Sequence, residues 1–203
     1  MSQDYKQIIQ REYLNCVKSP VHFMKKYCKI QHPTKGKIKF NLYDYQQEML
    51  TDFVDNRYNI ILKSRQLGIS TLSAGYSLWM MLFNQDKNIL VIAKDKDTAK
   101  NLVTKVRIMY ANLPQWLKTK VIEDNKLSLV FSNGSQIKAV AERQKQVVQK
   151  HYLYLLLMRL LLLTRLIQYG LLHNKHWQLV VIVLLFQHLM VWVIGSINNG
   201  WEQ

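Results

Sequence analysis

Apolar and polar residues follow two different periods along the first 142 residues. Apolar positions that recur with the 3.6-residue period of an amphipathic helix predict helices at residues 2–30 and 96–113. A further helix is predicted to start near residue 44 and to run to 54, and the mostly apolar stretch 70–83 predicts a helix that is buried on most sides. Short unbroken apolar runs predict two buried strands, at 59–63 and 87–94. Because strands and helices then alternate along the chain, the pattern predicts an α/β fold with a parallel sheet covered by helices on both faces.

Two shorter signals refine this prediction. Residues 126–141 hold two runs of alternating polarity around Asn133-Gly134, a pair that favours a tight turn between antiparallel strands. The turn-rich stretch "HPTKGK" (32–37) separates the first helical segment from the second. Asp44 is the predicted N-cap of that second helix.

The chain is strongly basic, with 28 Lys and Arg residues against 13 Asp and Glu and a formal net charge of +15. Such an excess favours a polyanionic partner, nucleic acid first and an anionic membrane second, with a merely solvated basic surface as the alternative. Cys16 and Cys28 are the only cysteines, which excludes a disulfide framework and fits a reducing compartment. His22 and His32 lie near them without zinc-site spacing, so we expect core or surface roles for all four.

The stretch "NIILKSRQLGIST" (59–71) carries the candidate chemistry. It predicts a buried strand that turns through Gly68 into a helix, an arrangement in which backbone N–H groups and a helix N-terminus hold phosphate oxygens. If Gly68 is the second glycine of the Walker A loop G-x-x-x-x-G-K-[ST], Ile69 occupies the lysine position and Ser70 the position of the magnesium-binding hydroxyl. An ordinary strand–turn–helix with one glycine explains the same residues.

Two cations at the start of the loop offer a replacement for the missing lysine. Lys63 stands at the position of the first Walker glycine, and its long side chain can reach back over bound phosphates. Arg65 adds a positive charge suited to the γ-phosphate in a phosphoryl-transfer transition state. Upstream, Tyr45 and Gln46 offer what an adenine base requires, an aromatic face and an amide that both donates and accepts.

The stretches "LYDYQQEML" (42–50) and "KSRQLGIST" (63–71) together resemble the ATPase domain of the large terminase subunit of tailed bacteriophages, over roughly residues 38–142. The loop of that family often reads S-R-Q-L-G-K-T-T, from which Ile69 departs. Other terminases carry the lysine at the start of the loop, as Lys63 does here. The resemblance implies a P-loop NTPase-like parallel sheet flanked by helices, here incomplete and preceded by a short helical N-terminal segment.

The same resemblance implies roles for particular residues. Arg65 and Lys63 look like catalytic cations, and the hydroxyl of Ser70 would bind Mg²⁺. The nucleotide-binding residues that it implies are Tyr45, Gln46, Lys63, Ser64, Arg65, Gln66, Leu67, Gly68, Ile69, Ser70 and Thr71. The implied activity is that of an ATP-hydrolysing motor that packages viral DNA into the phage head, with ATP and Mg²⁺ as cofactors. The implied partners are double-stranded DNA, the phage portal, the small terminase subunit and further copies of the chain, in the host cell cytoplasm and with no membrane.

The chain changes character after residue 142. Residues 1–142 contain twelve acidic residues, whereas 143–203 contain one, Glu202, together with fifteen leucines. By resemblance, this part should hold the Asp-Glu pair of a Walker B strand and a Ser-Thr-Pro-Asn-Gly coupling segment, and it holds neither. Without the two carboxylates, the metal and the attacking water have no protein ligands there. The run "WQLVVIVLLFQHLMVWVIG" (177–195) is also long enough to span a membrane.

We interpret this last part as translated in the wrong reading frame. Back-translated codons for residues 156–160, read one base earlier, can spell Ile-Asp-Glu-Ala. The same phase over residues 186–191 can spell Ser-Thr-Pro-Asn-Gly, and over residues 168–179 it can spell a run of good helix formers. One phase thus recovers both missing motifs in the expected order, and the slip falls near residues 141–146.

This interpretation divides the chain into three parts: a helical N-terminal segment at 1–37, a partial P-loop ATPase domain at 38–142, and an out-of-frame segment at 143–203 with no native domain. We expect such a truncated chain to be unstable and inactive as a motor. The basic residues expected to contact DNA phosphates lie at the end of the second predicted strand and after it, with a solvated helix face as the alternative: Lys94, Lys96, Lys100, Lys105 and Arg107.

Two other functions fit parts of the sequence. A helicase-like P-loop ATPase also joins an upstream glutamine to a phosphate loop, but it normally keeps the lysine that Ile69 replaces. A membrane-anchored basic DNA-binding protein would make the leucine-rich part authentic. Charged and polar residues interrupt or flank that part, at Arg159, Arg165, Lys175 and His188, and lipid-facing charge is unfavourable.

Overall fold

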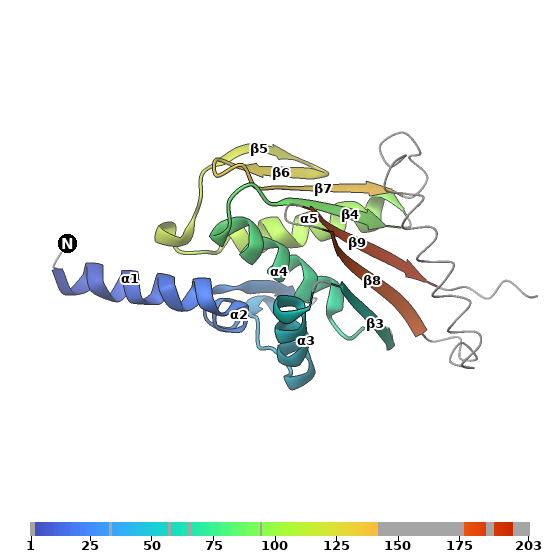
Figure 1. Ribbon diagram of the computed structural model, residues 1–203, viewed down its shortest axis with the longest axis horizontal. Helices are drawn as coiled ribbons and strands as arrows, with labels where there is room; N and C mark the ends of the chain where they lie inside the picture. Colours follow the sequence, from blue (N-terminus) through green and yellow to red (C-terminus); the bar gives the residue numbers. More distant parts are fainter. Residues whose placement is uncertain are drawn as a thin grey trace, which may run out of the picture.

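A computed structural model describes the chain at residues 3–32, 34–56, 58–64, 66–93, 95–141, 177–185 and 189–196. For the strands at 177–185 and 189–196, and for most of 58–64, the description covers the backbone alone. Helices and one large sheet form the body of the molecule, and the first helix projects away from it (Figure 1).

The N-terminal segment contains two helices and a hairpin, and not the single helix predicted for residues 2–30. Helix α1 spans Gln3–Lys18 and α2 spans Pro20–Tyr27. The break falls at Ser19, whose Oγ accepts a hydrogen bond from the N–H of His22 at 3.1 Å, with Pro20 at the first helical position. Such a cap followed by proline starts a new helix. Strands β1 (Lys29–His32) and β2 (Gly36–Lys39) then form an antiparallel pair.

The three helices of the central part lie close to their predicted positions. They are α3 at Asp44–Asp55, α4 at Ile69–Phe83 and α5 at Lys96–Ala111. The N-cap of α3 is Tyr43 and not Asp44 as predicted. At this cap the N–H of Tyr43 donates to Oε1 of Gln46 at 3.2 Å, so a glutamine side chain satisfies a backbone group at the helix start.

Within the described ranges, seven strands form the large sheet, in the spatial order β3-β8-β9-β4-β7-β6-β5. In chain order they are β3 (Tyr58–Ser64), β4 (Asn88–Ala93), β5 (Val121–Asn125), β6 (Ser128–Phe131), β7 (Gln136–Ala141), β8 (Trp177–Leu185) and β9 (Leu189–Ser196). Strand β4 is parallel to β7 and to β9, and every other neighbouring pair is antiparallel. The sheet is therefore mixed, and the prediction of a parallel sheet is correct only for its centre.

The direction of the strands explains this outcome. Following the pairings across the sheet, β3, β9, β4, β7 and β5 run one way, while β8 and β6 run the other. The unit β3–α4–β4 thus has the parallel sense that strand–helix alternation predicted. The β8–β9 hairpin lies between its two strands, so β3 and β4 are not neighbours (Figure 1).

The predicted hairpin around Asn133-Gly134 is confirmed, since β6 and β7 flank it and pair antiparallel. The amide Nδ2 of Asn133 donates to the carbonyl oxygens of Met81 at 2.8 Å and Asn84 at 3.0 Å. These bonds tie the turn to the C-terminal end of α4. The pattern missed β5, whose residues are mostly exposed at the edge of the sheet and therefore lack the alternation of a half-buried strand.

The run at 177–195, long enough in sequence for a membrane span, contributes to β8 and β9 of the sheet. Within the described ranges, no helix has the length and apolar character needed to cross a membrane. The proposed frame slip and residues 143–176 lie outside the described residues.

One hydrophobic core joins the N-terminal segment to the rest of the chain. Cys16, Met24 and Cys28 are buried in it together with the apolar residues of α4. The indole Nε1 of Trp79 donates to the carbonyl oxygen of Cys16 at 2.7 Å, which ties α1 to α4. Both cysteines are free thiols and buried, so of the core or surface roles expected for them the structure shows the core role. The boundary at residue 37 stays a prediction about the sequence, because residues on both sides of it share this core.

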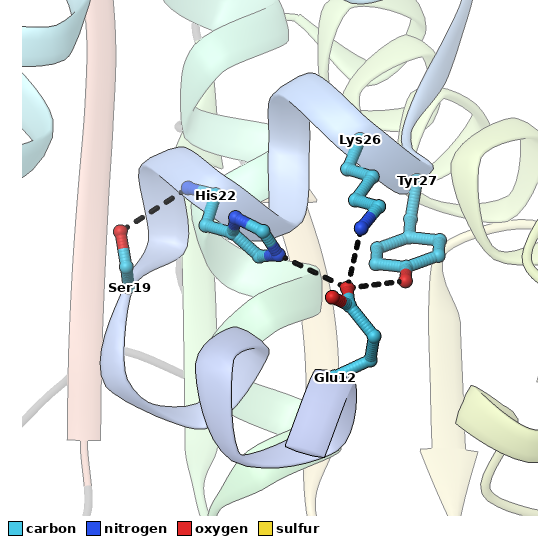
Figure 2. Close-up of polar contacts among 5 residues, drawn as sticks. All are labelled: Glu12, Ser19, His22, Lys26 and Tyr27. Atoms are coloured by element: carbon cyan, nitrogen blue, oxygen red, sulfur yellow. Dashed lines mark hydrogen bonds and ion pairs between the residues drawn. The ribbon is translucent and has the colours of Figure 1, made fainter. Parts of the chain in front are cut away.

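A single carboxylate holds α1 against α2 (Figure 2). Oε2 of Glu12 accepts hydrogen bonds from Nζ of Lys26 at 2.7 Å and from the hydroxyl of Tyr27 at 2.8 Å, and Nε2 of His22 lies 3.3 Å away. The Lys26 ammonium, followed by the Tyr27 hydroxyl, lowers the pKa of Glu12 from 4.5 to about 2. The carboxylate is thus stabilised in its charged form.

We predict that Glu12→Gln lowers stability at pH 7 and has little effect near pH 2. The folded-state pKa of Glu12 lies below its ordinary value, so the carboxylate stabilises the fold above about pH 4.5. This contribution is lost as the pH falls from 4.5 towards 2. The measurement is urea denaturation of the parent chain and the variant across this range.

The matched control is Asp4→Asn, which removes the same charge from α1 without touching the cluster. At pH 7 it should lower stability less than Glu12→Gln does, because no ion pair of Asp4 occurs in the described part of the chain. An effect of Glu12→Gln that is the same at both ends of the range would contradict the role assigned to the carboxylate.

Candidate nucleotide-binding loop

The loop between β3 and α4 makes a tight left-handed turn. Strand β3 ends at Ser64 and α4 begins at Ile69. Gln66 has a φ of 67° and Gly68 a φ of 70°. Glycine adopts this region freely, whereas a glutamine there is uncommon. Such a backbone conformation persists only where surrounding contacts hold it, and α3 supplies those contacts.

Tyr45 and Gln46 of α3 both donate to one carbonyl oxygen of the loop, that of Leu67. The Tyr45 hydroxyl lies 3.0 Å from it and Nε2 of Gln46 lies 3.1 Å from it. Burial raises the pKa of Tyr45, so its hydroxyl stays protonated and able to donate. The structure thus brings the two residues predicted to hold adenine directly onto the predicted phosphate loop.

Gln46 is fully engaged in this arrangement. Its side chain is 2% exposed, its Oε1 accepts from the N–H of Tyr43, and its Nε2 also lies 3.4 Å from the Tyr45 hydroxyl. Because a glutamine amide has two N–H donors, a base can use Gln46 only by taking the place of one of these partners. Its role in this structure is to join the start of α3 to the loop.

Gly68 is required for the close approach of this amide. A Cβ atom added at Gly68 would lie 2.9 Å from Nε2 of Gln46, closer than unbonded side-chain atoms normally approach. The end of a flexible side chain can usually move aside. Gln46 is buried and hydrogen-bonded at both ends of its amide, so it would have to release the carbonyl oxygen of Leu67.

Ile69, at the position of the Walker lysine, has its side chain in the hydrophobic core, where it is 2% exposed. What this residue offers a ligand is its backbone N–H. The N–H groups of Thr71 and Leu72 donate to the carbonyl oxygen of Gly68 at 2.9 and 3.0 Å. Those of Ile69 and Ser70 have no acceptor in the part of the chain that the structure describes, as is usual for the first turn of a helix.

The remaining predicted loop residues lie at the limit of the described chain. Lys63 and Ser64 end β3, where they pair with Gln178 and Trp177 of β8, but their side chains lie outside the description. Arg65 lies outside the described residues altogether. The roles of these three residues therefore stay predictions.

The predicted phosphate contacts on and before α5 differ among themselves. Lys96 and Lys100 are exposed, Lys105 is half-buried, and Lys94 lies outside the described residues. Arg107 is already engaged: its Nε forms an ion pair with Asp124, and its guanidinium also donates to the carbonyl oxygen of Ser128 at 3.3 Å. A phosphate would have to compete with these partners for the guanidinium.

Sequence reasoning missed Tyr43. Its ring stacks on that of Tyr45, with centroids 5.6 Å apart and planes 8° from parallel. The side chain of Tyr43 is 66% exposed, so one flat aromatic surface stands beside the loop in contact with solvent. The signal in the sequence was a second aromatic residue two positions before Tyr45.

The loop fits a nucleotide phosphate in some respects. A left-handed glycine, two N–H groups without an acceptor in the described chain and the hydroxyls of Ser70 and Thr71 are the groups that phosphate loops use. No cluster of three or more His, Cys, Asp or Glu side chains suited to a metal occurs within the described ranges. Among the described side chains of the loop, the oxygen ligands that a metal ion could use are therefore uncharged and include the hydroxyls of Ser70 and Thr71.

Comparison with known proteins supports the fold. No protein-family model matches the chain. The structure is similar to the crystal structure of the HK97 bacteriophage large terminase, with a TM-score of 0.51 and 16% sequence identity. The match covers 64% of this chain and 28% of the HK97 protein. The chain thus has a mixed α/β, terminase-like fold over the matched part, which corresponds to less than a third of that terminase.

We predict that Gly68→Ala destabilises the chain more than Gly36→Ala. Both glycines have a left-handed φ, 70° and 68°, but a Cβ at Gly36 would meet no atom within 4 Å. Gly36→Ala should cost about 1 kcal/mol for the backbone alone. Gly68→Ala should cost about 2–3 kcal/mol, because it also displaces the Gln46 amide. Urea denaturation of the two variants measures the difference.

The extra loss at Gly68 should disappear when Gln46 is already replaced by alanine. A double-mutant cycle of Gly68→Ala and Gln46→Ala tests this coupling. Equal losses for Gly36→Ala and Gly68→Ala, or full additivity in the cycle, would show that the contact between the amide and the loop does not hold the turn.

Proposed function

We propose that this chain is part of a DNA-packaging ATPase of the large-terminase type, with its nucleotide site at residues 63–71. The observation that carries the proposal is the contact of Tyr45 and Gln46 with the loop before α4, in a chain whose fold is similar to a phage large terminase. An ordinary strand–turn–helix needs no such contact from a distant aromatic–glutamine pair.

In this proposal, the loop backbone binds and orients the phosphates. Gly68 lets the chain turn close to them, and the N–H groups of Ile69 and Ser70 donate to their oxygens. We assign to the hydroxyl of Ser70 the binding of Mg²⁺, as in a Walker A loop. When bound, ATP with Mg²⁺ supplies the phosphoryl group whose hydrolysis drives a motor of this kind. The exposed ring of Tyr43 extends the aromatic surface that Tyr45 offers to the base.

The positive charge for the phosphates is proposed to come from the start of the loop. The side chain of Ile69 belongs to the core, so a cation cannot be supplied from the usual Walker position. Lys63, at the end of β3, and Arg65, directly after it, are the nearest cations in the sequence. We assign to Lys63 the stabilisation of phosphate charge and to Arg65 that of the charge which develops during transfer.

The acidic residues that hydrolysis requires are proposed to lie in the alternative reading frame. Between residues 143 and 201 the chain carries no Asp or Glu. The frame-corrected protein would act on double-stranded DNA in the host cell cytoplasm, together with the portal, the small terminase subunit and further copies of itself. The chain without these acids would bind nucleotide without turning it over.

We predict that sequencing the coding DNA across codons 135–203 reveals Ile-Asp-Glu-Ala and Ser-Thr-Pro-Asn-Gly in one shifted frame. Both motifs must occur in the same phase and in that order. A shifted frame that is closed by stop codons, or that spells neither motif, would show that the leucine-rich part is authentic and would remove hydrolysis from the proposal.

In the frame-corrected protein, we predict that Lys63→Ala lowers the rate of ATP hydrolysis by about 100-fold or more, because it removes the charge that stabilises the phosphates. A phosphate-release assay under saturating ATP measures the rate. Lys126→Ala, which removes an exposed lysine between β5 and β6, is the matched control and should keep the parent rate. A Lys63→Ala protein that hydrolyses ATP normally would contradict the assignment of the loop.

A further inference from the structure

The charge of the N-terminal segment is distributed very unevenly. Residues 13–43 contain seven lysines and no Asp or Glu. Four of these lysines, at 29, 35, 37 and 39, belong to the β1–β2 hairpin or its turn. None of the candidate DNA contacts predicted from sequence lies in this segment, since all of those follow β4.

The register of the hairpin places its lysines on one face. Lys29 lies opposite Lys39, and Gln31 opposite Lys37. All four residues are exposed, while Ile30 and Ile38, which alternate with them, are half-buried. Because side chains alternate between the two faces of a strand, Ile30 and Ile38 share one face of the hairpin with His32, and the other face carries only lysine and glutamine. We call this outer face, together with Lys35 at the turn, the basic ribbon.

The lysines of the basic ribbon repel one another. The N–H of Phe40 donates to the carbonyl oxygen of Cys28 at 3.0 Å, which makes residues 28 and 40 a hydrogen-bonded pair. The next pair, Lys29 and Lys39, is then of the non-hydrogen-bonded type, whose side chains lie closer together. Like charges placed directly opposite destabilise a hairpin. No carboxylate in the described part of the chain forms an ion pair with the lysines of the ribbon.

Contacts on the other side hold the hairpin in place. Ile30 packs against the hydrophobic core, and Phe40, directly after β2, is buried in it. At the turn, Nδ1 of His32 lies 3.2 Å from the backbone N–H groups of Thr34 and Lys35, which donate to it. The lysines therefore stand on an ordered backbone and not on a free tail, although their mutual repulsion is unfavourable.

We propose that the basic ribbon is a contact surface for the phosphate backbone of double-stranded DNA. Ammonium groups on a polar face neutralise phosphates and release counterions without reading bases. A two-stranded ribbon also has the width that the major groove admits, about 12 Å. The ribbon exposes no aromatic or aliphatic side chain of the kind that enters a lipid headgroup layer, so nucleic acid fits it better than a membrane does. The choice of duplex DNA rests on the function proposed above.

The test compares two triple variants with the same loss of charge. One is Lys29→Gln, Lys37→Gln and Lys39→Gln on the ribbon. The other is Lys6→Gln, Lys120→Gln and Lys126→Gln, three exposed lysines to which no DNA contact is assigned. Binding of each full chain to a fluorescein-labelled 30-base-pair duplex is measured by fluorescence anisotropy between 50 and 200 mM salt, and thermal unfolding checks that each variant folds. A third variant, with arginine at positions 29, 37 and 39, restores the charge.

We expect the ribbon variant to bind DNA at least tenfold more weakly than the parent at 100 mM salt. The slope of log K against log salt should fall by roughly 2–3, since each lost phosphate contact removes about 0.9. The control variant should change affinity by less than about threefold, and the arginine variant should bind like the parent. The expected pattern assigns the contacts to the ribbon, because the net charge of the ribbon and control variants is equal.

Several outcomes would overturn the proposal: equal losses for the ribbon and control variants, unchanged binding of the ribbon variant, or no DNA binding by the parent chain. A loss of binding to vesicles with 30% phosphatidylserine, with DNA binding unchanged, would assign the ribbon to a membrane. The ATP site is tested separately by binding of a fluorescent ATP analogue to the Lys63→Ala chain. If that variant binds the analogue normally while DNA binding still depends on the ribbon, the ATPase proposal fails and the ribbon remains.

Discussion

The carbonyl oxygen of Leu67 accepts two hydrogen bonds from α3, and this junction determines where α4 begins. Leu67 precedes the left-handed glycine at which the helix starts. The two donors, the Tyr45 hydroxyl and the Gln46 amide, come from the start of α3. Because α4 is buried on most of its surface, a shift at its first turn would be transmitted to the core on every side. The loop is thus held by the same contacts that order the interior, which favours a preformed site over one that assembles on binding.

The N-terminal segment depends on the same helix. Trp79 of α4 donates to the carbonyl oxygen of Cys16, and Gly75 of α4 lies against Met24 of α2. The carboxylate of Glu12 then closes α1 onto α2. Through these contacts the hairpin that follows α2 has a defined position relative to the body, although its lysines repel one another. A DNA contact placed there would rest on the same hydrophobic core that also contains the start of α4.

Most elements of the central part could be predicted from apolar periodicity, because their burial decides their pattern. Helix α4 and strand β4 are examples, since nearly every residue faces the core. The break at Ser19-Pro20 was also present in the sequence, as a cap residue before a proline, but the continuous apolar stripe concealed it. The burial of the Ile69 side chain in the core could not be predicted from the sequence. A residue at the start of a helix can point to a ligand or to the core, and only tertiary packing decides between them. The same holds for Gln46, whose partners are brought together by the loop and by the cap of α3.

Sequence patterns predicted least well which strands of the sheet run parallel and which run antiparallel. Strand direction matters for the candidate phosphate site, because it decides which strand ends lie beside the loop. The carboxyl ends of β3, β9, β4 and β7 lie at one edge of the sheet, and the loop leaves β3 at that edge. In open α/β sheets, ligands bind at the carboxyl ends of parallel strands.

Val180–Val183 of β8 is a β-branched run, a composition that favours strand formation in any sheet with room for it. Strands β8 and β9 therefore occupy the centre of this sheet through backbone pairing. Neither strand contains a carboxylate. The acid that a phosphate site needs at this edge has to follow a strand that runs parallel to β3. After Glu142 the chain contains no acidic residue until Glu202. The shifted frame that we propose would supply such an acid at the end of an apolar run.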